Sequence, residues 1–158
     1  MSDKKKIIER GQRVVGLERD ALAAVRERLD DSFARAVLLM HESKGRVIVA
    51  GVGKSGLIGR KIAATLTSTG TPATFLHPAD SVHGDLGIVD ADDVAILISK
   101  SGESDELLPL IEHLKRMGVK LISLTGDPKS ALAKHSDVII DASVKEEACP
   151  HDLAPTTS

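Results

Sequence analysis

Apolar and polar positions follow two different rhythms along this chain, and the change falls near Gly45. Beyond it, five short apolar-rich runs are separated by segments whose apolar residues recur at three- and four-residue steps. Short apolar runs fit buried strands, and the longer steps fit helices that cover them. The runs are Val47–Ala50, Ala73–Leu76, Val94–Ile98, Lys120–Leu124 and Val138–Ile140. The pattern predicts an α/β fold, with a five-stranded parallel sheet flanked by helices on both faces.

The first 44 residues follow a helical rhythm throughout. Ile8, Val15 and Leu22 recur at helical spacing between charges, and a second helix is expected from about Ser32 to Ser43. We therefore divide the chain into an N-terminal helical segment (1–44) that packs on the domain and a core (45–158). The two helices either cover one face of the sheet or contribute to a subunit interface, and the pattern leaves both open.

Bulk composition narrows the class of protein. A length of 158 residues suits one domain with a buried core. The net charge of -2 offers no basic face for nucleic acid, and two Phe without Tyr or Trp offer no platform for base stacking. No apolar run reaches membrane-spanning length, and a single cysteine, Cys149, fits a reducing compartment. We expect a cytoplasmic protein that binds neither nucleic acid nor membrane.

A hydroxyl-rich loop follows the apolar run Val94–Ile98. Ser99, Ser101 and Ser104 precede apolar residues at helical spacing, which predicts a strand, a tight loop and a helix N-terminus. Free N–H groups and partial positive charge attract phosphate to such a terminus. Gly102 lets the backbone approach a ligand closely. One serine as a helix cap is the alternative, but three serines and a glycine favour a phosphate site.

A glycine-rich loop follows the first strand. Gly51–Gly56 matches the G-x-G-x-x-G pattern of dinucleotide-binding proteins, yet no Asp or Glu lies between Gly56 and Asp80 to hold a ribose hydroxyl. A P-loop would need glycine in place of Ile48. We interpret this segment as a second anion-binding loop that carries Lys54.

Carboxylates and histidines are the candidates for chemistry. Glu103 and Glu106 lie three residues apart, which predicts one shared helix face, and Glu147 follows the last strand. These acids either act in proton transfer or only complement a helix N-terminus and a surface loop. His77 and His83 lie in the longest connection, and two histidines without a third ligand are weak evidence for a metal site.

Four segments carry a resemblance to a known family: GVGKSGLIGRKIAATLTSTGTP, HPADSVHGDLG, ISKSGESDE and KEEACPHDLAPTTS. In order and content they resemble the sugar isomerase (SIS) domain of the D-arabinose 5-phosphate isomerase family. The resemblance covers the chain from about Arg46 onward. It implies the SIS fold, a flavodoxin- or Rossmann-like three-layer sandwich. It also implies an aldose–ketose isomerase that interconverts D-ribulose 5-phosphate and D-arabinose 5-phosphate through an enediol, the entry to Kdo synthesis for lipopolysaccharide or capsule.

The resemblance assigns roles by position. The catalytic positions of the family fall on Lys54, Glu106 and Glu147. The substrate-binding set expected from the loops and the resemblance is Gly53, Ser55, Gly70, Thr71, His77, His83, Ser99, Lys100, Ser101, Gly102, Glu103, Ser104, Thr156, Thr157 and Ser158. His77 matches a position that can take zinc, while the proton transfer itself requires no cofactor. A phosphorylated pentose is the implied substrate, and a homo-oligomer, dimer or tetramer, the implied assembly.

The chain ends on a segment, Leu153 to Ser158, that is typical of a helix start. Family members continue with a C-terminal helix, a catalytic histidine and paired CBS domains, so we expect a longer protein and leave turnover by this chain alone open. A non-catalytic phosphosugar-binding regulator is the alternative function. The pair Glu106 and Glu147 favours the enzyme, and the missing ribose acid disfavours a nicotinamide oxidoreductase.

Overall fold

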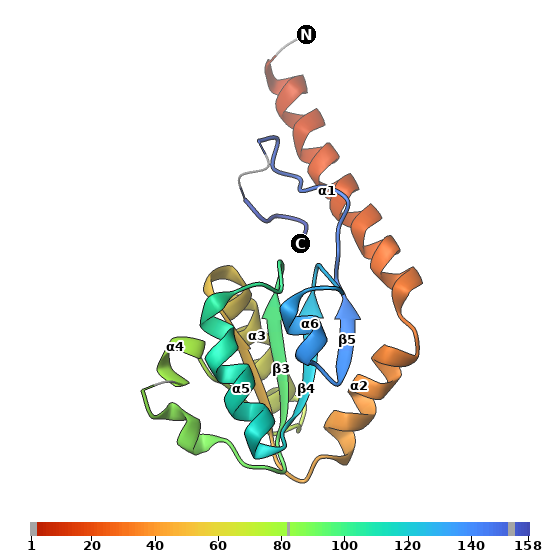
Figure 1. Cartoon of the computed structure of the whole chain (residues 1–158). Helices are drawn as coiled ribbons and strands as arrows, with labels where there is room; N and C mark the ends of the chain where they lie inside the picture. The colour runs from red at the N-terminus through yellow and green to blue at the C-terminus, as the bar shows by residue number, and fades with distance from the viewer. Residues whose placement is uncertain (1–2, 82, 152–153) are drawn as a thin grey trace.

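Five parallel strands form one sheet in the computed structural model, which describes residues 3–81, 83–151 and 154–158 (Figure 1). The strand order is β2-β1-β3-β4-β5, so the chain crosses over between β2 and β3. The strands are β1 (Val47–Gly51), β2 (Ala73–Phe75), β3 (Val94–Ser99), β4 (Lys120–Thr125) and β5 (Val138–Asp141). All five predicted strands are confirmed, each within a residue or two of its expected bounds.

The pairing register brings the carboxyl ends of the strands to one edge. Gly51 pairs with Ile98, and Thr125 pairs with both Ser99 and Asp141. The loops that leave β1, β3, β4 and β5 therefore begin side by side, which is the edge where ligands bind in parallel sheets.

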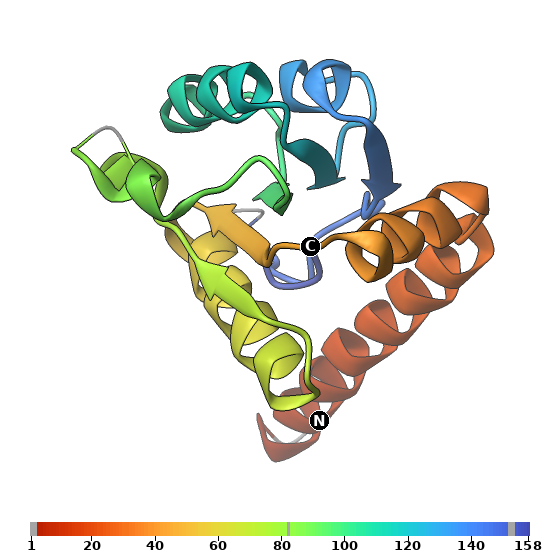
Figure 2. The ribbon, with the colours of Figure 1, turned by 90° about the horizontal axis from the view of Figure 1, so that it is seen from below.

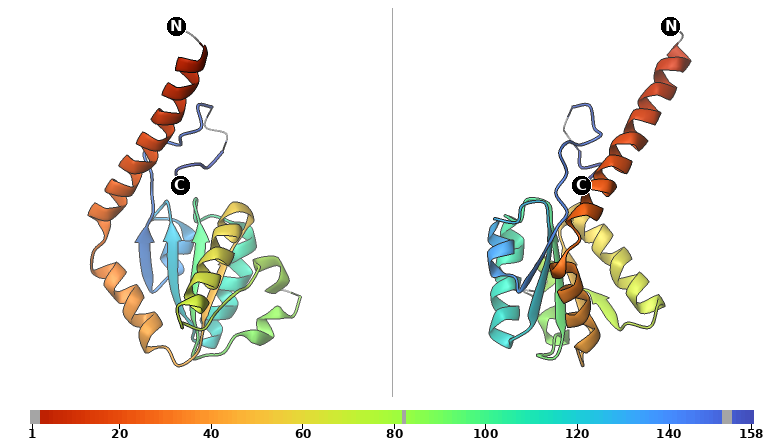
Figure 3. Two further views of the ribbon diagram at one scale, coloured as in Figure 1. Left: turned by 180° about the vertical axis from the view of Figure 1, so that it is seen from behind. Right: turned by 90° about the vertical axis from the view of Figure 1, so that its right-hand side faces the viewer.

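Helices cover both faces of the sheet (Figures 2 and 3). Helices α2 (Asp31–Glu42) and α3 (Gly53–Ser68) lie on one face, and α5 (Leu108–Met117) and α6 (Ala131–His135) lie on the other. Strand residues alternate between the two layers: Leu97 belongs to the cluster with Leu110, and Val94 to the cluster with Ala36. The predicted three-layer α/β sandwich is confirmed.

The long connection between β2 and β3 contains structure that the sequence did not predict. A short helix, α4 (Pro78–Ser81), and a 3-10 turn, η1 (Asp85–Ile88), lie where we expected only a loop. Short elements of this kind lack the repeated apolar spacing on which a helix prediction depends.

The first helix, α1 (Asp3–Arg28), projects from the body of the molecule (Figure 1). It has no buried residue, whereas α2 packs against β5 through Ala36. Arg28, at the end of α1, donates to the carbonyl oxygens of Asp141 and Ser143, which fastens this end to the last strand. The predicted helices are confirmed, and of the two N-terminal helices α2 is the one whose described residues pack on the sheet. Within the described residues no helix is both long and apolar enough to span a membrane.

Candidate active site

A pocket of about 450 Å³ opens beyond the carboxyl ends of the strands. The start of α3, the loop after β3, the turn after β4 and the segment after β5 all contribute to its wall. Its hydroxyl groups come from Ser55, Ser99, Ser101, Ser104 and Ser158, and Lys100 brings an ammonium group to them. Several hydroxyl donors around one cation suit an anion such as a phosphate.

The serine loop, residues 99–104, is held by its own hydroxyl groups. Ser99 Oγ accepts from the Gly102 N–H at 3.0 Å and lies 3.0 Å from Ser104 Oγ. Ser101 Oγ accepts from the Glu103 N–H at 3.2 Å. The sequence left open whether the serines shape the local backbone or bind a ligand. The structure is compatible with both roles, because the hydroxyl groups that shape the loop also line the pocket.

The helix expected directly after this loop begins later than predicted. A 3-10 turn, η2 (Asp105–Leu107), precedes α5, which starts at Leu108. Glu103 lies in the loop and Glu106 in η2, so the prediction of one shared helix face is wrong. Glu106 is exposed and does not belong to the described lining of the 450 Å³ pocket.

The second predicted anion-binding segment is also shorter than expected, because α3 begins at Gly53 and not after Ser55. Lys54 and Ser55 therefore lie in the first turn of α3, which contains no acidic residue. A lysine at a helix N-terminus adds its charge to the partial positive charge of the helix dipole. A bound anion is attracted to both charges and compensates them. Lys54 lines an adjoining hollow of about 560 Å³, together with Lys100 and Thr156.

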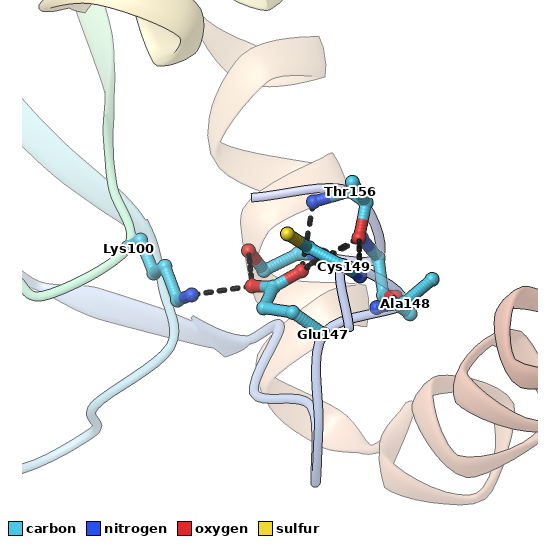
Figure 4. A network of polar contacts seen from close by, with 7 residues as sticks. Lys100, Glu147, Ala148, Cys149 and Thr156 are labelled. Carbon is cyan, nitrogen blue, oxygen red and sulfur yellow. Dashed lines mark hydrogen bonds and ion pairs between the residues drawn. The ribbon is translucent and has the colours of Figure 1, made fainter. Parts of the chain in front are cut away.

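Glu147 is the most constrained acid of the site, with a side chain only 4% exposed. Its carboxylate accepts from Lys100 Nζ and from Ser158 Oγ. The backbone N–H groups of Thr156 and Thr157 donate to the same carboxylate at 2.8 Å each. Figure 4 shows Lys100 reaching Glu147 from one side and Thr156 from the other.

These contacts set the charge of Glu147. Burial alone would raise the pKa of the carboxyl, but hydrogen bonds from Lys100, Ser158, Thr156 and Thr157 outweigh it and hold the pKa far below its usual range. Glu147 is therefore a firmly ionised carboxylate, and it makes a weak base as long as these donors stay in place.

Other predicted residues lie away from the pocket. Helix α3 carries the chain from the pocket edge to the opposite edge of the sheet, where Gly70 and Thr71 precede β2. His77 follows β2, and its Nδ1 accepts from the Ala79 N–H at 3.2 Å. His83 is exposed between α4 and η1. Within one subunit the structure does not bring these four residues to the serine loop.

Zinc at His77 would need further ligands near this side chain. Across residues 3–81, 83–151 and 154–158, no group of three or more His, Cys, Asp or Glu could hold a metal ion. A zinc site needs three or four such ligands, so His77 by itself does not fit one.

Besides Val52 and Ile98, three further residues that line the pocket were not predicted from the sequence: Gly126, Ala142 and Val144. They follow β4 and β5 directly, and position after a strand was the available signal. They lack the hydroxyl, charged or glycine-rich patterns that mark a candidate, and their contribution is the shape of the wall.

Comparison with known proteins decides the family. A sequence profile of the SIS domain matches residues 39–158, which is most of the chain. The chain belongs to the SIS family. The family recognised from the four sequence segments is thereby confirmed, and the serine loop of this SIS domain lies inside the matched region.

Relatives of this SIS domain are named as isomerases. Arabinose 5-phosphate isomerase KdsD of Pseudomonas aeruginosa is 51% identical over 158 residues, covering 100% of this chain and 48% of that protein. The enzyme of the same name from Escherichia coli K12 is 50% identical over 148 residues, covering 94% of this chain and 45% of that protein. The chain thus spans about half the length of the curated relatives it matches.

A solved structure supports the same grouping. A protein of E. coli CFT073, solved in complex with arabinose 5-phosphate, superposes with a TM-score of 0.93 at 42% identity. The match covers 100% of this chain and 84% of that one. The SIS fold described above is therefore shared across the whole described length.

Proposed function

We propose that the chain is the isomerase domain of a D-arabinose 5-phosphate isomerase, which interconverts D-ribulose 5-phosphate and D-arabinose 5-phosphate. The observation that carries the proposal is the 51% identity to a P. aeruginosa enzyme of that name over all 158 residues. The pocket supports it, because five serines and Lys100 gather at the sheet edge where ligands bind.

The proposed reaction moves a proton between C1 and C2 of the open-chain sugar through an enediol. The serine loop holds the phosphate and so fixes the reacting end of the sugar through remote binding energy. Lys54 stabilises the negative charge that develops on oxygen. Glu106 or Glu147 carries the proton, and the two residues stand as alternatives.

Glu147 needs a change of partners before it can accept a proton. Its resting carboxylate accepts from Lys100, and Lys100 belongs to the loop that would bind the phosphate. A phosphate therefore competes with Glu147 for the ammonium group. The loss of this hydrogen bond raises the pKa of Glu147 toward its usual value and makes the carboxylate a better base.

The proposal also covers the cofactor requirement, the pathway, the cellular compartment and the assembly of the protein. The proton transfer uses no cofactor, and no step is routed through zinc at His77. The product supplies Kdo synthesis, as the family resemblance implies, in the cytoplasm, which suits the single cysteine. The protein works as a homo-oligomer, a dimer or tetramer, because α1 leaves apolar side chains such as Val15 uncovered.

A non-catalytic phosphosugar-binding module is the second candidate. The observation that favours it is the state of Glu147, whose carboxylate is fully engaged by Lys100 and the 156–158 segment. A binding module needs the serine loop but no free base, so in this alternative the Glu147 contacts persist when the sugar phosphate binds.

Calorimetric binding of arabinose 5-phosphate to this chain, with NAD as control ligand, tests the proposal, followed by an isomerase assay on the same sample. We expect the sugar phosphate to bind and NAD not to bind. Binding of NAD alone would return the glycine loop to the dinucleotide class.

In a full-length version, Glu147→Gln should abolish turnover but not binding if Glu147 carries the proton, and an unchanged rate would leave that role to Glu106.

A further inference from the structure

Three hydrogen bonds join the serine loop to the turn and helix that follow β4. The Gly126 N–H donates to the Lys100 carbonyl at 3.0 Å, and the Leu132 N–H donates to the Gly102 carbonyl at 3.0 Å. The third bond uses a side chain, because the Ala131 N–H donates to Glu103 Oε1 at 2.8 Å. The loop and the start of α6 are therefore built as one unit.

Side-chain packing tightens the same junction. A Cβ on Gly102 would overlap the hydroxyl of Ser130, so the two segments touch at that point. Ser130 in turn caps α6, since its Oγ accepts from the Ala133 N–H at 3.3 Å. A shift of α6 is thereby passed directly to the backbone of Gly102, in the middle of the serine loop.

Glu103 stands out in this loop because it is an acid in a segment that gathers anion-binding groups. A carboxylate beside a phosphate site repels the ligand it is meant to bind. The structure gives it another partner: its oxygen is directed to Ala131, and Glu103 is not part of the described lining of the 450 Å³ pocket. The resemblance placed Glu103 among the substrate-binding residues, and the geometry gives it a different task.

We propose that Glu103 is a positioning residue, which anchors the serine loop to the first residue of α6 and does not touch the substrate. The inference rests on the proposed phosphate site, since it explains how that site is kept in shape. Ser101 and Gly102 lie directly before Glu103, so the anchor fixes the groups that would face the phosphate. Its charge strengthens the bond to the Ala131 N–H.

The variants Glu103→Ala and Glu103→Gln distinguish a positioning role from direct contact with the substrate. They do so because one removes the hydrogen-bond acceptor and the other removes only the charge. Glutamine keeps an oxygen that accepts from the Ala131 N–H, whereas alanine removes the acceptor. We expect Glu103→Ala to weaken binding of arabinose 5-phosphate about tenfold, the equivalent of one good hydrogen bond. Glu103→Gln should bind within about twofold of wild type, or more tightly, because a negative charge is gone. Asp105→Ala, an exposed acid two residues along, is the matched control.

Ala131→Pro tests the other end of the same bond. Proline removes the N–H donor, and it is tolerated at the first position of a helix. Ser130 already has the extended backbone that a following proline requires, with φ -62 and ψ 168. We expect Ala131→Pro to weaken binding as much as Glu103→Ala, and the double variant to be no worse than either. A full affinity in Ala131→Pro would overturn the proposal.

Amide hydrogen exchange supplies a readout that needs no ligand. In Glu103→Ala the N–H of Gly102, which donates to Ser99 Oγ, should exchange at least about tenfold faster, and in Glu103→Gln it should stay protected. Unchanged exchange in Glu103→Ala would refute the anchor even if the sugar phosphate binds. Failure of the wild-type chain to bind sugar phosphate, with faster exchange in Glu103→Ala, would refute the proposed function and keep the anchor.

Discussion

A single carboxylate, that of Glu147, joins distant parts of the candidate site. It accepts from Lys100, which lies in the serine loop, and from Ser158, which lies in the segment that follows β5. Its burial makes each of these donors matter, because a buried carboxylate without them would be strongly destabilised. At the scale of one residue, the ionised carboxylate of Glu147 thus helps to hold the serine loop and the segment after β5 in their places.

This arrangement predicts how stability depends on pH. The folded pKa of Glu147 lies below its ordinary value of about 4.5, so the stabilisation is present above that value and is lost as the pH falls below it. Glu147→Gln should lower the free energy of unfolding by about 2 kcal/mol at pH 7. The difference from wild type should shrink between pH 5 and pH 3, as measured by urea unfolding.

The neighbouring acid supplies the control for that experiment. Glu146 is exposed, with a side chain 57% accessible beside Arg13. Glu146→Gln should keep the full acid-induced loss of stability seen in the wild type. If Glu147→Gln lost as much stability between pH 5 and pH 3 as Glu146→Gln does, the hydrogen bonds to Glu147 would not hold its pKa down.

Gly102 gives a second prediction at the scale of one residue. Its φ of 66 lies in the left-handed region, and an added Cβ would overlap Ser130. Gly102→Ala should therefore destabilise the fold by about 3 kcal/mol, from backbone strain and overpacking together. Gly118 has a φ of 83 but open space around it, so Gly118→Ala should cost only about 1 kcal/mol. Equal losses in urea unfolding would show that the contact with Ser130 does not matter.

At the scale of elements, strands were predictable because an uninterrupted apolar run such as Val94–Ile98 has one stable place, the centre of a covered sheet. Helix starts were harder. Helix α3 begins at Gly53, whose φ of 58 depends on local geometry and not on apolar spacing. The hydrogen-bond partners of Glu147 could not be predicted from the sequence either. The N–H groups of Thr156 and Thr157 reach its carboxylate only because the chain folds back after Glu147.

The packing of α2 on the sheet can be tested by substitution. Ala36 is 4% exposed and packs with Val94, Ile122 and Val138, whereas Ala34 on the same helix is exposed. Ala36→Asp buries a charge and should destabilise the protein by about 3 kcal/mol. Ala34→Asp should cost only the difference in helix propensity, about 0.6 kcal/mol. Similar losses in thermal unfolding would contradict the packing of α2 described here.

At the scale of the whole molecule, α1 is the helix whose described residues are least covered by the rest of the fold. It is 26 residues long and none of them is buried, while its end is fastened through Arg28. Ile8, Val15 and Leu22 are 59%, 66% and 71% exposed and recur every seven residues along the helix. An isolated helix with such a stripe is stabilised by packing it against a partner, and in a homo-oligomer that partner is a second copy.

The proposed oligomer therefore depends on this stripe, and replacing one of its members by lysine should weaken the assembly. Val15→Lys places a charge in the stripe and should shift the chain toward monomer by sedimentation equilibrium at micromolar concentration, because a charge is costly in an apolar interface. Glu9→Lys adds the same side chain outside the stripe and should leave the assembly intact. A wild-type chain that sediments as a monomer would refute the assembly. An oligomer that tolerates Val15→Lys would move the interface elsewhere, and α1 would then need another partner for its apolar side chains.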